Sequence, residues 1–62
     1  MESTKFISST WHAVRVFPIT KTLDKAVFVV APALHGRIIE RADLYGYSYS
    51  LEADNQLVIN FN

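Results

Sequence analysis

Hydroxyl groups and an imidazole lie close together near the start of the chain. Three hydroxyl residues at positions 8–10 lie just before His12, and a serine beside a histidine is the pair with which many hydrolases activate a nucleophile. Those enzymes also need a sharp turn that exposes the serine and N–H groups that bind the oxyanion, and no such segment accompanies these residues. No pair of carboxylates is placed for acid–base catalysis either. We therefore predict no catalytic residue and expect that the protein is not an enzyme.

Metal and cofactor sites are not indicated by the remaining residue types. The two histidines, His12 and His35, have no cysteine to assist them, and a zinc site would need carboxylates in a spacing that the sequence does not contain. The two glycines, Gly36 and Gly46, are too far apart to form a loop that cradles phosphate. We expect neither a metal nor a cofactor.

Basic and aromatic side chains recur between residues 11 and 25, and they suggest a nucleic-acid surface. Small β surfaces hold single strands by stacking bases on aromatic rings and by contacting phosphates. Against this, the formal net charge is zero, whereas nucleic-acid-binding domains have a clear basic excess. A nucleic-acid-binding regulator is therefore the alternative function. Its predicted contact residues are Trp11, His12, Arg15, Lys21 and Lys25.

A protein interface is the function that size and composition favour. Hydrophobic residues make up 50% of the 62 residues. A chain of this length buries only about 60% of its extended surface, so some apolar surface is left for another chain. Tyrosine, tryptophan and arginine are the usual anchors of such interfaces. The predicted interface residues are Trp11, Val14, Arg15, Val16 and Tyr45.

The predicted function is thus a small non-enzymatic protein-binding module that forms a homodimer and binds a further protein. Its expected type is an accessory or inhibitor protein of a phage or mobile element, directed against a host defence or regulatory factor. Size and charge alone suggest this type, since no motif specifies it. No signal peptide is visible and no apolar run has the length of a membrane helix. We therefore expect a cytoplasmic protein without a membrane partner.

The elements that position these side chains include a β-hairpin at residues 47–61. Large apolar residues alternate with smaller or polar ones along both of its runs, as in strands with one buried face. A three-residue loop at residues 53–55 keeps the apolar residues together, because a one-residue shift would turn one apolar face to water. The predicted pairs are Tyr47 with Phe61, Tyr49 with Ile59, and Leu51 with Leu57. Leu51 is then on the buried face, and Leu51→Asp should unfold the domain.

One helix is predicted over residues 33–45. Pro32 suits its first turn and Gly46 suits the left-handed position at which helices commonly stop. A single apolar stripe at helical spacing gives the helix a buried face. The stripe consists of Leu34, Ile38, Ala42 and Tyr45.

The first half of the chain predicts two strands. β-Branched and aromatic residues favour strands over residues 11–19 and 26–31. The alternative for the second segment is a helix that Thr22 caps and that ends at Ala31. Residues 1–10 are expected to form a loose arm or a short edge strand.

The predicted fold is a single small α+β domain of residues 1–62. It has two layers, an antiparallel sheet in the order β-β-α-β-β and one helix packed on one face. The first two strands are apolar on both faces, so a second copy or a partner protein is expected to cover this part of the sheet. Residues 1–37 carry a net positive charge and residues 38–62 a net negative charge, which suits contacts of mixed charge.

Overall fold

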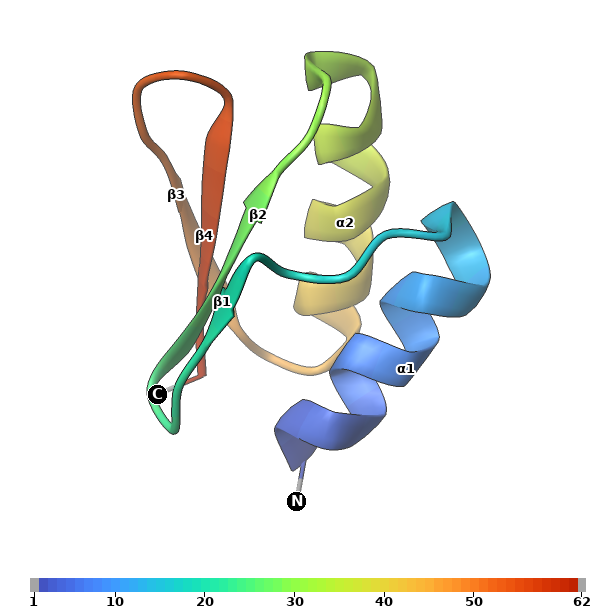
Figure 1. Ribbon diagram of the computed structural model, residues 1–62. Helices are drawn as coiled ribbons and strands as arrows, with labels where there is room; N and C mark the ends of the chain where they lie inside the picture. The colour runs from blue at the N-terminus through green and yellow to red at the C-terminus, as the bar shows by residue number, and fades with distance from the viewer. Residues whose placement is uncertain (1, 62) are drawn as a thin grey trace.

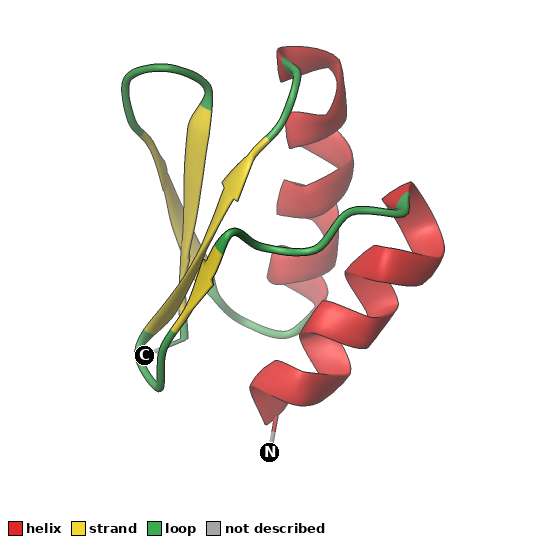
Figure 2. Ribbon diagram, in the orientation of Figure 1, coloured by secondary structure: helices red, strands yellow, loops and turns green. Residues whose placement is uncertain are grey.

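Two helices cover one face of a four-stranded antiparallel sheet in the computed structural model, which describes residues 2–61 (Figure 1, Figure 2). The strands lie in the order β1-β2-β4-β3, so β3 is an edge strand. In chain order the elements are α1 (Glu2–Val14), β1 (Thr20–Lys21), β2 (Lys25–Val29), α2 (Pro32–Leu44), β3 (Ser48–Leu51) and β4 (Gln56–Asn60). The small α+β class and the antiparallel sheet are confirmed.

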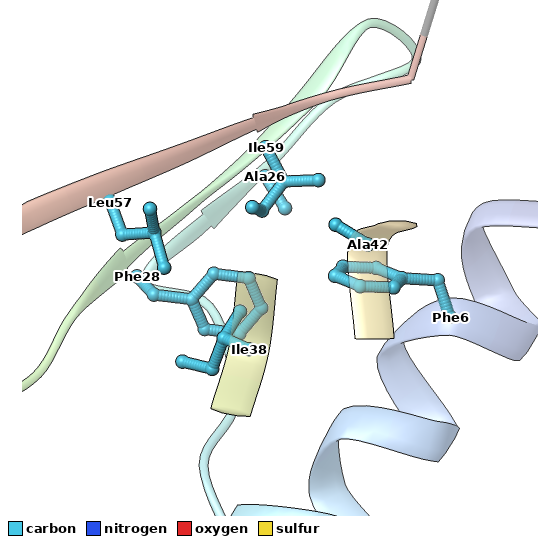
Figure 3. Packing of buried hydrophobic residues seen from close by; sticks show 7 residues of the cluster. All are labelled: Phe6, Ala26, Phe28, Ile38, Ala42, Leu57 and Ile59. Carbon is cyan, nitrogen blue, oxygen red and sulfur yellow. The ribbon is translucent and has the colours of Figure 1, made fainter. Parts of the chain in front are cut away.

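The core lies between the helices and the inner face of β2 and β4. Every second residue of these strands points to this face, in register across the pair. α2 covers the face with Ile38 and Ala42, and α1 adds the ring of Phe6 (Figure 3). The fully buried hydrophobic residues are Phe6, Ala26, Phe28, Ile38, Ala42, Leu57 and Ile59. Since both helices lie on this side, the outer face of the sheet is open (Figure 2).

The second half of the chain follows the prediction closely. α2 spans Pro32–Leu44, and Gly46 follows it with a φ of 76°, a left-handed conformation that glycine adopts without strain. The strand expected over residues 26–31 is β2, so the alternative helix there is wrong. No helix within residues 2–61 combines the length and the apolar content that crossing a membrane requires.

The C-terminal hairpin has the predicted register. Tyr49 pairs with Ile59, and Leu51 pairs with Leu57. The two strands of the hairpin differ in burial. Leu57 and Ile59 on β4 are fully buried, whereas Tyr49 and Leu51 on the edge strand β3 remain largely exposed. The prediction that Leu51 is buried is therefore wrong, and Leu51→Asp is no longer expected to unfold the domain.

The N-terminal segment differs most from the prediction. Residues 2–14 form α1, so a loose arm or strand over residues 1–10 and a strand over residues 11–19 are both wrong; Met1 lies outside the described residues. The order is α-β-β-α-β-β, with two helices in the described part of the chain. The strand after α1 is reduced to Thr20–Lys21.

The helical spacing of two buried residues explains why α1 forms. Phe6 and Thr10 are four residues apart, share one helix face and are both fully buried. The Thr10 hydroxyl donates to the carbonyl oxygen of Phe6 at 2.9 Å, so its polar group is satisfied inside the core. Tertiary burial of this face outweighs the weak helix propensity of a segment rich in serine and threonine.

Candidate functional site

An aromatic cluster lies on the surface where α1 ends, and it consists of Trp11, Arg15 and Phe17. The rings of Trp11 and Phe17 are stacked, with centroids 4.8 Å apart and planes 4° from parallel. The guanidinium carbon of Arg15 lies 5.5 Å from the centroid of the Trp11 ring, within the range of a cation–π interaction. Phe17 is 60% exposed, so the stack presents a large apolar surface to solvent.

The backbone after α1 creates this cluster. Arg15 has a φ of 60°, and its N–H donates to the carbonyl oxygen of Trp11 at 2.8 Å. This left-handed turn ends the helix and directs the following residues back along it. Pro18 restricts the residue before it to an extended backbone, which limits the conformations of Phe17. Phe17 was not among the predicted interface residues, since nothing in the sequence indicates that it stacks on Trp11.

The structure separates the residues that the sequence assigned to a protein interface. Trp11 and Arg15 meet in the aromatic cluster, whereas Val14 and Val16 are partly buried and pack against the core. Tyr45 lies elsewhere, at the end of α2. Its ring contacts the aromatic core, and its hydroxyl donates to the backbone carbonyl oxygen of Lys5 at 3.4 Å.

The residues assigned to nucleic-acid binding do not form one surface. Lys21 and Lys25 lie on the β1–β2 hairpin, whose turn is at the lower left of Figure 1, whereas α1 ends at the upper right. Trp11 and Arg15 are therefore distant from both lysines. His12 faces a different feature, a groove between the two helices.

The groove between α1 and α2 has a volume of about 700 Å³. Its walls combine basic and hydroxyl side chains, and no acidic side chain lines it among the described residues. The lining residues are Thr4, Lys5, Ser8, Ser9, His12, Ala13, Arg41 and Tyr45. The groove is thus rich in hydrogen-bond donors and positive in character.

The hydroxyl residues before His12 are divided between the groove and the core. Ser8 and Ser9 line the groove together with His12, but Thr10 points into the interior. Hydrolytic serine–histidine sites use a further group, commonly a carboxylate, to orient the imidazole, and none lines the groove within the described residues. The arrangement suits the binding of an anion better than nucleophilic catalysis.

The second histidine lies apart from both features. His35 Nε2 is 3.0 Å from the carbonyl oxygen of Val30; because a carbonyl can only accept, this nitrogen carries the proton and donates. Among residues 2–61, no three or more histidine, cysteine or acidic side chains come together in a way that could hold a metal ion.

No family model, curated protein or solved structure matches the chain. The fold and the two surface features therefore define the class of protein: a small α+β domain that carries an exposed aromatic cluster and a donor-rich groove between its helices.

Proposed function

We propose that the protein is a non-enzymatic protein-binding module and that the aromatic cluster of Trp11, Arg15 and Phe17 is its contact surface. The observation that carries the proposal is the exposed stack of Phe17 on Trp11, with Arg15 over the same ring. Tryptophan and arginine are the residue types that contribute most often to binding energy in protein interfaces. An accessory or inhibitor protein, which acts by occupying a surface of its target, fits a module of this kind.

The rigidity of the cluster supports the proposal. Side chains that are already held in place lose less conformational entropy when a partner binds. The two rings hold each other in a parallel stack, and Pro18 limits the backbone of Phe17. The stack and the proline therefore both reduce the conformational freedom that Phe17 would lose when a partner binds.

The conformation of Arg15 supports it further. A left-handed φ is rare for residues other than glycine and costs about 1 kcal/mol, and Arg15 adopts it with a φ of 60°. Glycine would satisfy the same helix end without strain. The strain at Arg15 is offset in part by its contact with the Trp11 ring, which keeps the guanidinium in the cluster.

Self-association is part of the proposal: in the absence of a partner a second copy occupies the aromatic cluster, and the partner protein displaces this copy when it binds. The open outer face of the sheet is less suited to this role, because its apolar residues are flanked by polar ones. The central cross-strand row on that face is Thr20, Val27, Val58 and Ser50. We expect light scattering of the purified protein to give the mass of a dimer, and Phe17→Ser to shift it toward that of a monomer. A dimer that Phe17→Ser leaves intact would exclude the cluster as the self-contact.

Phe17→Ser is also the direct test of partner binding. We expect tagged protein to capture a stoichiometric protein from a lysate of its natural host after nuclease treatment, and Phe17→Ser to weaken binding of the purified partner about 30-fold or more. Leu23→Ser is the matched control, since Leu23 is a large apolar residue that is exposed on the β1–β2 turn. Equal loss with both variants, or capture that disappears with nuclease, would contradict the proposal.

Arg15→Gly should separate binding from stability. Relief of the left-handed strain and loss of the contact with Trp11 are each worth about 1 kcal/mol and oppose each other, so we expect the free energy of unfolding to change by less than about 1 kcal/mol. Binding of the captured partner should weaken about tenfold, as for an interface arginine. Urea denaturation and titration calorimetry measure the two quantities. Unchanged affinity would remove Arg15 from the contact surface.

A further inference from the structure

We propose that the groove between α1 and α2 binds a small organic phosphate of about the size of a mononucleotide. The groove is separate from the aromatic cluster, because neither Trp11 nor Phe17 lines it. The inference therefore does not depend on the proposed protein-binding function.

The charges of the groove favour an anion. Lys5 and His12 stand on the α1 wall and Arg41 stands on the α2 wall, so that basic groups approach the groove from both helices. Among residues 4–61, whose side chains the structure describes, no carboxylate lines the groove to neutralise them. Lys5 and His12 are seven residues apart along α1, which corresponds to about 10 Å. A ligand between them would face Arg41 on the opposite wall.

The hydroxyl groups favour phosphate among the anions. Ser8 and Ser9 line the groove between the levels of Lys5 and His12, and each hydroxyl can donate a hydrogen bond. A phosphate group has more acceptor oxygens than a carboxylate and commonly binds to arginine and lysine together with neutral donors. The mixture of cations and hydroxyls therefore matches the phosphate better.

The size of the groove and its apolar parts indicate an organic ligand. The groove is open to solvent and has a volume of about 700 Å³, of which a lone phosphate would occupy little. Ala13 and Tyr45 are among its lining residues and add apolar atoms to the polar ones. A ring attached to the phosphate would bury these groups from water.

The distribution of the other cations favours a small ligand over a polymer. A nucleic-acid strand needs basic side chains that follow its backbone beyond one pocket. Lys21 and Lys25 lie on the β1–β2 hairpin and Arg15 belongs to the aromatic cluster, so these cations do not extend the groove. The formal net charge of zero also lowers the attraction to a polyanion.

The test is a titration of ¹⁵N-labelled protein with AMP, followed by the chemical shifts of the backbone amides. Adenosine and inorganic phosphate serve as the two halves of the ligand. We expect saturable shifts that centre on Ser8, Ser9 and Arg41, with AMP binding more tightly than either half. Absence of saturable shifts, or equal affinity for adenosine and AMP, would overturn the proposal.

Two pairs of variants locate the site. Arg41→Gln should weaken AMP binding about tenfold, as for loss of a hydrogen bond to a charged group, whereas Arg37→Gln, one turn away on α2 and outside the lining, should leave the affinity within about twofold. Lys5→Gln and its control Lys21→Gln repeat the comparison at exposed positions, where the substitution should not disturb folding. This second pair therefore tests the site even if Arg41→Gln folds poorly. If a variant and its control lost equal affinity for AMP, the binding would reflect general electrostatic attraction to the protein, and the proposed site would be wrong. Much tighter binding of a single-stranded oligonucleotide, weakened by Lys21→Gln, would overturn the small ligand in favour of a nucleic acid.

Discussion

Phe6→Ala should remove most of the protein's stability and leave a measurable fraction of it unfolded at room temperature. The Phe6 side chain is 0% exposed and is the fully buried hydrophobic residue that α1 contributes to the core. Its ring makes edge-on contacts with the rings of Phe28, Tyr45, Tyr47 and Phe61. Removing a buried phenylalanine costs about 3–5 kcal/mol, and a domain of this size has a total stability near the lower end of the usual range of about 5–15 kcal/mol.

Phe17→Ala is the matched control for this prediction. It removes the same atoms from a side chain that stands in solvent beside Trp11, so its expected effect on the free energy of unfolding is about 1 kcal/mol or less. Urea denaturation followed by circular dichroism compares the two variants with the natural chain. If Phe6→Ala were as stable as Phe17→Ala, the packing of α1 against the core would have to be rejected.

Leu57→Asp should abolish folding. Leu57 lies on the central strand β4, is 0% exposed and faces the helices. An aspartate there would have to bury a charge without a partner or take up a proton, and either outcome costs several kcal/mol. We expect the spectrum of an unfolded chain at neutral pH.

Leu51→Asp makes the same change directly across the sheet. Leu51 pairs with Leu57 on the same face, but it belongs to the edge strand and is 57% exposed. Its charge can be hydrated, so the variant should fold and lose about 1 kcal/mol or less. Unfolding of both variants would mean that β3 is covered in solution, which a second copy of the chain on this edge would explain.

Both proposed sites depend on the position of α1. One side of the helix contributes Trp11 to the aromatic cluster, and another contributes Lys5 and His12 to the groove. A variant that detaches α1 from the core would therefore lose both kinds of binding together. A loss of binding in a variant of either site can be assigned to that site only if the free energy of unfolding, measured on the same sample, is unchanged.

The second half of the fold follows from the sequence because its signals are local. Alternation along residues 47–61 sets both the face and the register of the hairpin, since side chains on a strand repeat every second residue. The apolar stripe of α2 and the glycine at which the helix stops, Gly46, are likewise formed by residues within a few helical turns of each other. The predictions of a strand at residues 26–31 and of an antiparallel sheet rest on the same short-range patterns.

Only the tertiary structure decided the first third of the chain and, with it, both sites. β-Branched residues at positions 14 and 16 favour a strand by local propensity, but burial of Phe6 among aromatic residues from the second half of the chain favours a helix. These ring contacts join residues 39 to 55 positions apart along the chain, and no local pattern encodes them. The groove exists because α1 lies beside α2, and the aromatic cluster exists because Arg15 turns Phe17 back onto Trp11.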